Sequence, residues 1–246
     1  MQLPTPTWMT LRRDLVHVWT ISLPTEQSTP SADVGVLSSD EVSRAQRFVF
    51  AEDRRGYMHA HAALRHILGG YLNADPSSLS FAQMERGKPY LSGAHASSSL
   101  CFNLSHTRGL ALCAIGLGRE VGVDVETIAR SMDVDGVARQ AFSPAEQDAL
   151  LQLEGEERKA AFFRVWTRKE AYVKAIGDGF SRNTRHFTVS SVEDDGDALL
   201  SGHLHLHDAP AWRIQPVQCP HGYCGAVAAA GRYWSVQASF WAPLPA

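Results

Sequence analysis

The stretch Val121-Gly122-Val123-Asp124-Val125-Glu126 decides how the rest of this chain is interpreted. Alternating valines predict a β-strand, in which successive side chains point to opposite faces. Asp124 and Glu126 therefore share one face, about 6–7 Å apart, and the valines fill the other. Two carboxylates on one face repel each other unless a cation lies between them.

A second stretch, Trp166-Thr167-Arg168-Lys169-Glu170-Ala171-Tyr172-Val173-Lys174, predicts a helix. Its apolar residues recur at helical spacing and form a stripe (Phe162, Phe163, Trp166, Val173 and Ile176). Glu170 falls on or beside that stripe, where a lone carboxylate is costly unless it is paired, neutralised or bound to metal. Together with Asp124 and Glu126 it would complete an all-oxygen site for a hard cation such as Mg²⁺.

Both stretches also have simpler interpretations. An Asp-x-Glu pattern is usually the solvated face of an edge strand. Glu170 and Lys174 are four residues apart, which is the spacing of an ordinary surface pair on a helix.

Composition limits the possible functions. The chain has 246 residues, 44% hydrophobic and 20% charged, with a net charge of −3. We expect a globular protein without the basic field that nucleic acid requires. No apolar run reaches membrane-spanning length, and no signal peptide is expected, so we predict a cytoplasmic protein. The cysteines match no common zinc pattern: Cys101 and Cys113 lie in predicted strands, and Cys219 and Cys224 lack a second pair.

Strands and helices are mixed without regular alternation, which predicts the α+β class. Ser105 to Gly109 is expected to form a hairpin turn, and the chain beyond residue 184 to form strands and turns. His203, His205 and His207 alternate as on an exposed strand edge. We predict strands at 15–23, 79–84, 97–104, 110–117 and 121–126, and helices that begin at Ser38, near Asp53, at Ser143 and near residue 157.

Four motifs in this order are more specific than any one of them. They are Arg-Gly-Lys-Pro-Tyr-Leu (86–91), Phe-Asn-Leu-Ser-His (102–106), Gly-Val-Asp-Val-Glu (122–126) and Trp-Thr-Arg-Lys-Glu-Ala-Tyr-Val-Lys-Ala-Ile-Gly-Asp-Gly (166–179). From about Ser38 to about Gly179 the chain resembles the 4′-phosphopantetheinyl transferases of the surfactin-synthetase-activating type.

The resemblance implies a fold of two similar α+β halves related by a pseudo-twofold axis, with the active site between them. We place the halves at residues 1–120 and 121–246. Lys88, Ser105 and His106 would come from the first half, and the three acids with Lys174 from the second.

The resemblance also implies a role for each matching residue. Asp124, Glu126 and Glu170 match the magnesium ligands, and Asp124, Glu170 and Lys174 form the expected catalytic set. Arg44 matches a basic residue near the 3′-phosphate of coenzyme A. Glu41 stands three residues earlier, where a second basic residue is sometimes found, and this departure puts the 3′-phosphate contacts in question. The expected contacts with coenzyme A are Arg44, Arg86, Lys88, Ser105, His106, Lys169 and Lys174.

The implied activity is Mg²⁺-dependent transfer of 4′-phosphopantetheine from coenzyme A to a serine of an apo acyl or peptidyl carrier protein, with release of adenosine 3′,5′-bisphosphate. Glu170 is the candidate base. We expect a monomer that binds neither nucleic acid nor membranes. Two alternatives stay open: a metal-dependent coenzyme A phosphohydrolase, and a non-catalytic module that binds coenzyme A or the carrier. The sequence does not tell whether fatty-acid, polyketide or nonribosomal-peptide carriers are served.

Overall fold

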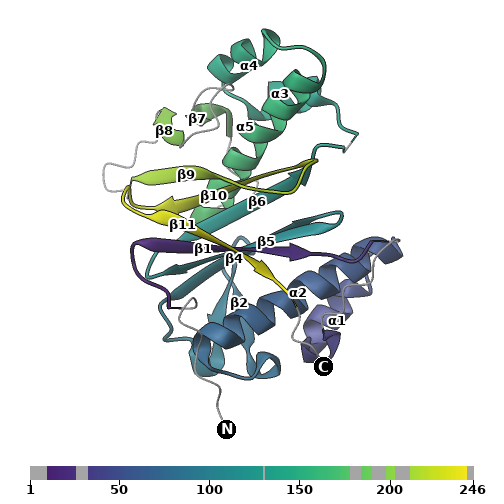
Figure 1. Cartoon of the computed structure of the whole chain (residues 1–246), viewed down its shortest axis with the longest axis vertical. Coiled ribbons are helices and arrows are strands. Elements are labelled where there is room, and N and C mark those ends of the chain that lie inside the picture. The colour runs from purple at the N-terminus through teal and green to yellow at the C-terminus, as the bar shows by residue number, and fades with distance from the viewer. Residues whose placement is uncertain are drawn as a thin grey trace.

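The fold is built from two β-sheets stacked between two long helices. A computed structural model describes residues 10–25, 33–129, 131–177, 184–189, 198–202 and 211–242. From bottom to top, Figure 1 shows helix α2 (Ala51–Leu72), the first sheet, the second sheet and helix α5 (Gly155–Ile176). This mixture of segregated helices and largely antiparallel sheets confirms the predicted α+β class.

The first sheet has the strand order β11-β1-β5-β4 within the described residues. Its pairs are antiparallel except β1 with β11, which run parallel. One face packs on α2, where Leu64, Ile67 and Leu68 meet Trp19 and Ile21 of the sheet. The strands are β1 (Leu15–Ser22), β4 (Leu100–Thr107), β5 (Leu110–Leu117) and β11 (Ser235–Trp241).

The second sheet has the order β6-β10-β9-β8-β7, and its neighbouring strands are antiparallel. Its outer face packs on α5, where Phe162, Phe163 and Ala171 meet Ile214 and Ala226. The strands are β6 (Val121–Thr127), β7 (Phe187–Val189), β8 (Ala198–Gly202), β9 (Trp212–Val217) and β10 (Tyr223–Ala230).

The inner faces of the two sheets enclose a third core. Val16 and Val18 of β1 and Leu112 of β5 pack there against Val123 and Val125 of β6. The side chains of residues 121–126 therefore alternate between two faces, as predicted. The valines enter the core between the sheets, and Asp124 points to the other face.

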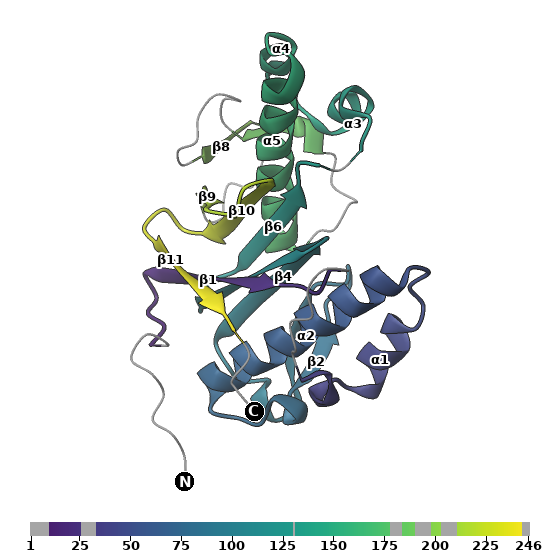
Figure 2. The same cartoon turned by 45° about the vertical axis from the view of Figure 1, so that its right-hand side comes forward.

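The remaining elements are short. Ser38 and Ser143 each begin a helix, as the sequence predicts, and in the structure each has a full capping box. Figure 2 shows α1 beside α2 at one end of the molecule and α3 and α4 near α5 at the other. These elements are η2 (Val34–Val36), α1 (Ser39–Ala45), η3 (Pro76–Ser78), β2 (Ser80–Gln83), β3 (Pro89–Ser92), η4 (Gly93–His95), α3 (Val134–Ala141), α4 (Pro144–Leu151) and η6 (Thr184–His186). None of the described helices combines the length and apolar character needed to cross a membrane.

Both predicted ends of the strand at 97–104 are wrong, since β4 begins only at Leu100 and ends later than predicted. Ser105 and His106 lie in β4, which continues to Thr107, and the hairpin turn consists of Arg108 and Gly109. The strand extends because Ser105 and His106 still pair with Leu112 and Ala111 of β5. The polar side chains of the motif are thus held rigidly by a strand.

The two expected halves share a strand. β11 comes from the end of the chain but pairs with β1 in the first sheet, so the chain crosses between the sheets again after residue 230. The division at residue 120 and the pseudo-twofold axis stay predictions. His203, His205 and His207 lie outside the described residues.

Gly122 allows β6 to approach α5 closely. A Cβ atom at this position would lie 2.2 Å from the carbonyl oxygen of Ala171 and 2.3 Å from the amide nitrogen of Ala175. Both contacts are with helix backbone, which cannot move aside without shifting the helix. The glycine therefore fixes how near the acids of β6 come to the side chains of α5.

We expect Gly122→Ala to lower the free energy of unfolding by roughly 2–3 kcal/mol, because overpacking against backbone forces the strand and helix apart. Urea unfolding measures the loss. Gly56→Ala is the matched control: its Cβ would meet only Leu23 at 3.9 Å, and alanine in a helix interior is favoured by about 0.5–1 kcal/mol. Equal stability of the Gly122→Ala variant and the wild type would contradict this account of the packing.

Candidate active site

The centre of the candidate site is a hydrogen-bonded triangle of side chains from three elements. The Nζ atom of Lys174, on α5, lies 2.5 Å from Oδ1 of Asp124, on β6. It also donates to Oγ of Ser105, on β4, at 2.9 Å. Ser105 in turn donates to Oδ1 of Asp124 at 3.0 Å. Residues far apart in the sequence thus meet as the motifs predict.

The site lies where β4 and β6, the edge strands of the two sheets, run past each other. Side chains of β4 take the place of a backbone ladder there. The Oδ1 atom of Asn103 accepts from the amide of Val123 at 2.9 Å, and Oγ of Ser105 accepts from the amide of Val125 at 3.4 Å. Sequence analysis placed Asn103 within a motif but gave it no role; its role is to align the two strands.

The three predicted acids are close enough to affect one another. Glu170 is 7% exposed. Its pKa is raised to about 7, first by burial and then by the negative charge of Asp124, with a smaller contribution from Glu126, while Lys174 opposes the shift. Oδ2 of Asp124 is buried without a hydrogen-bond partner in the described structure. A crowded set of carboxylates with an unpartnered oxygen favours a cation.

No group of three His, Cys, Asp or Glu side chains in the described residues is already arranged around a metal position. Lys174 provides a reason, because its ammonium group sits on Asp124 and supplies the positive charge that the acids require. The geometry brings Asp124, Ser105 and Lys174 together, with Glu170 and Glu126 near enough to interact electrostatically.

A second cluster surrounds the ring of Tyr57, on α2. The His106 ring meets it edge-on with centroids 6.3 Å apart, and the guanidinium carbon of Arg44 lies 5.8 Å from its centroid. The pKa of His106 is lowered to about 4, by desolvation first and then by the positive charges of His61, Lys174 and Arg44. The His106 side chain is exposed, so an anion in the solvent could reach it. The negative charge of such an anion would offset the positive charges of His61, Lys174 and Arg44.

Lys88 and Arg86 lie on the β2–β3 hairpin. The Lys88 ammonium group is bound to Glu120 at 2.6 Å and to the carbonyl oxygen of Ala175 at 2.6 Å, and the side chain is buried. No hydrogen bond joins it to the Asp124 triangle. Arg86 is exposed. The predicted contacts of these two residues with coenzyme A stay predictions.

Lys169 lies in a different environment from the one predicted. It is 1% exposed and ion-paired with Glu146 at 2.8 Å. Its ammonium group also donates to the carbonyl oxygens of Thr184 and Phe187, both at 2.7 Å. With its donors used in this way, Lys169 joins α5 to α4 and β7, and this geometry does not support the predicted contact with coenzyme A.

Glu41, the departure noted in the sequence, is buried in a network that sequence analysis missed. It accepts from Arg65 at 2.7 Å and contacts Nδ1 of His61 at 3.0 Å, besides capping α1. Burial acts to raise its pKa, but the hydrogen bonds from His61 and Ser38 and the charge of Arg65 lower it to about 2. Glu41 is therefore an anion that links α1 to α2.

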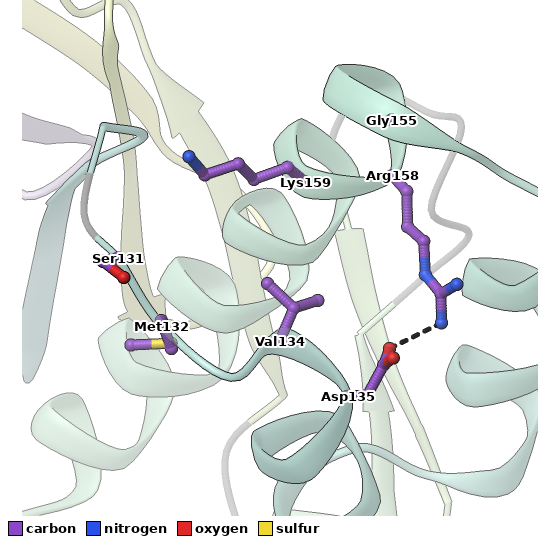
Figure 3. Close-up of a pocket in the computed structure, with 7 residues that line it drawn as sticks. All are labelled: Ser131, Met132, Val134, Asp135, Gly155, Arg158 and Lys159. Atoms are coloured by element: carbon purple, nitrogen blue, oxygen red, sulfur yellow. Dashed lines mark hydrogen bonds and ion pairs between the residues drawn. The ribbon is translucent and has the colours of Figure 1, made fainter.

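A hollow of about 360 Å³ lies elsewhere, between the start of α3 and the first turns of α5 (Figure 3). Lys159 reaches over it, and Arg158 is paired with Asp135 at its edge. Lys159 and Glu170 are about 16 Å apart along the helix axis, at 1.5 Å per residue. The hollow is separate from the acid cluster.

Comparison with known proteins shows the family of this chain. A family described as the 4′-phosphopantetheinyl transferase superfamily matches residues 120–228, and one described as 4′-phosphopantetheinyl transferase, N-terminal, matches residues 23–115. The chain belongs to the 4′-phosphopantetheinyl transferase superfamily. The resemblance seen in the four motifs is thereby confirmed.

Individual relatives extend the likeness over the whole chain. The chain is 40% identical to the 4′-phosphopantetheinyl transferase HetI of a Nostoc species, over 97% of both chains. It is 32% identical to the putative 4′-phosphopantetheinyl transferase slr0495 of a Synechocystis species, over 81% of this chain and 80% of that one. With Sfp of Bacillus subtilis it shares 28% identity, over 84% and 88% of the two chains.

The acids of the site should differ in their effect on stability. The pKa of Glu170 in the folded protein is raised above its ordinary value of 4.5, so the folded state holds this proton longer than the unfolded state. Its contribution favours folding below about pH 4.5 and is lost as the pH rises through about 7. Asp124 is instead paired with Lys174 and bonded to Ser105.

We therefore expect Glu170→Gln to stabilise the metal-free protein at pH 8 by on the order of 1 kcal/mol, with the gain shrinking toward pH 5. Asp124→Asn should destabilise it at both pH values. Thermal unfolding in EDTA measures both variants. A Glu170→Gln variant that loses more stability at pH 8 than at pH 5 would refute the electrostatic account.

Proposed function

We propose that this chain transfers 4′-phosphopantetheine from coenzyme A to a serine of an apo acyl or peptidyl carrier protein. The observation that carries the proposal is the Asp124–Ser105–Lys174 triangle, because it brings an acid, a hydroxyl and an ammonium group from three elements to one point. The names of the relatives and the two family matches support the same activity.

The acid cluster fits a Mg²⁺ ion. Among the described residues, Asp124 has a buried oxygen without a hydrogen-bond partner. The negative charges of Asp124 and Glu126 raise the pKa of Glu170, and Lys174 opposes this shift only in part. A divalent cation would reduce the remaining electrostatic repulsion between the acids. Asp124, Glu126 and Glu170 would hold the ion. When bound, Mg²⁺ draws negative charge from the pyrophosphate of coenzyme A.

Lys174 and His106 are placed to neutralise the phosphates. Lys174 is 30% exposed at its side chain, so its ammonium group can exchange Asp124 for a phosphate oxygen without crossing the core. His106 is exposed on the same strand as Ser105 and lies among positive charges. Charge-assisted bonds to phosphate oxygens are about twice as strong as neutral ones.

Glu170 is our candidate for the group that takes the proton from the carrier serine. Asp124 is already bonded to Lys174 and Ser105, whereas no hydrogen bond to the Glu170 carboxylate occurs within the described part of the chain, so an oxygen that does not bind the ion could accept the proton. In this reaction the serine oxygen forms a bond to the β-phosphorus of coenzyme A. The bond from that phosphorus to the bridging oxygen breaks, and adenosine 3′,5′-bisphosphate leaves with that oxygen.

Intact mass spectrometry of a panel of apo carrier proteins, with coenzyme A and Mg²⁺, tests the proposal. We expect at least one carrier to gain the mass of a single phosphopantetheine group. Coenzyme A cleaved in the absence of any carrier would indicate the phosphohydrolase instead. The non-catalytic module would be indicated if coenzyme A binds but is neither cleaved nor transferred to any fatty-acid, polyketide or nonribosomal-peptide carrier.

The same assay tests the metal. We expect EDTA to abolish transfer and Mg²⁺ to restore it, and Asp124→Asn to lower the transfer rate by at least about 100-fold at saturating coenzyme A, since one missing electrostatic group at a reacting centre costs about 3 kcal/mol or more. Glu85→Gln, on the exposed β2–β3 turn, is the control and should keep full activity. Transfer at the wild-type rate in EDTA would contradict the assignment of the three acids as metal ligands.

A further inference from the structure

Three basic side chains surround the Tyr57 ring. Two of them, Arg44 and His106, were predicted from the sequence to contact coenzyme A, and the third was not. Besides Arg44 and His106, the imidazole of His61 lies against that ring with centroids 4.0 Å apart. His61 is also near enough to His106 to lower its pKa. The three come from α1, α2 and β4, and Tyr57, 3% exposed, forms their common base.

The outward nitrogens of these side chains are not taken up within the described part of the chain. Arg44 and His106 make no hydrogen bond or ion pair there, and both are exposed. His61 uses Nδ1 for Glu41, and no bond to Nε2 occurs among the described residues. Arg65, by contrast, is buried and donates to Glu41 and to the carbonyl oxygens of Pro76 and Leu79.

Glu41 sets the direction of His61. Its carboxylate is fixed by Arg65 at 2.7 Å and by the capping box of α1, so it cannot follow the imidazole if the ring turns. A carboxylate that accepts from Nδ1–H leaves Nε2 as the nitrogen that can face a ligand.

We infer that His61, oriented by Glu41, joins Arg44 and His106 in binding a phosphate monoester, the 3′-phosphate of coenzyme A. The inference rests on the proposed function. It assigns to Nε2 of His61 a contact with the phosphate that position 41 does not provide, because this chain has a carboxylate there in place of a basic residue. His61 is thus a specificity-determining residue, and Glu41 a positioning residue.

The test compares coenzyme A with 3′-dephospho-coenzyme A as donors for His61→Asn. Asparagine keeps a donor near the position of Nδ1 for Glu41 and removes Nε2. We expect kcat/KM to fall by about 10–100-fold with coenzyme A, the value of one charge-assisted bond, and by less than about threefold with the dephospho donor. The change should lie in KM. Arg44→Ala should show the same selectivity.

His66→Asn is the matched control, because His66 is on the same helix but lies against Trp241. It should leave both donors unaffected. Equal losses with both donors for His61→Asn, or no loss with either, would overturn the inference.

Calorimetric binding of adenosine 3′,5′-bisphosphate and of adenosine 5′-monophosphate separates this inference from the proposed function. His61→Asn should weaken the first by about 10–100-fold and leave the second within about threefold. If the wild type transfers nothing to any carrier but His61→Asn shows this selective loss of binding, the proposed function fails and the phosphate site stands. If transfer occurs and His61→Asn binds both nucleotides like the wild type, only the site is refuted.

A double-mutant cycle tests Glu41. Glu41→Gln should, like His61→Asn, lower kcat/KM more with coenzyme A than with the dephospho donor. Near-UV circular dichroism verifies that this variant is folded. Combined with His61→Asn it should add little further loss, because both changes remove one oriented nitrogen. Additive losses, or equal losses with both donors, would assign Glu41 a purely structural role.

Discussion

The site depends on one ion pair, in which the ammonium group of Lys174 lies on Asp124 and Ser105. The pair joins α5 to β6 and, through Ser105, to β4 of the other sheet. The two sheets also meet through the apolar core between them and through the bond from the Val123 amide to Asn103. The polar triangle at the crossing of β4 and β6 therefore helps to align the two sheets and to position Asp124.

This arrangement also explains how the protein can hold several carboxylates close together without a cation. Burial and like charges raise the pKa of Glu170, while Lys174 offsets part of the repulsion. Gly122 permits the close approach of strand and helix that creates the crowding. The charge that destabilises the metal-free protein is the same charge that would attract Mg²⁺, so stability and binding are linked through these groups.

Much of the fold and of the acid cluster could be predicted because it follows from short periods. A period of two places Asp124 opposite Val123, and helical spacing places Glu170 toward the apolar stripe. Lys169 shows the limit of such patterns, since it directly precedes Glu170 and points about 100° away around the helix, into an ion pair with Glu146. The Glu41–His61–Arg65 network could not be predicted, because it requires the packing of α1 on α2.

The most direct test of the central claim is the titration of the Glu170 side-chain carboxyl by carbon-13 NMR, in the metal-free protein and with Mg²⁺. The account predicts a midpoint near pH 7 without metal, raised by burial and by Asp124. With Mg²⁺ the midpoint should fall below the ordinary value of 4.5, because the cation favours the charged form. A midpoint near the ordinary value of 4.5 in both samples would contradict the claim that three acids share one site.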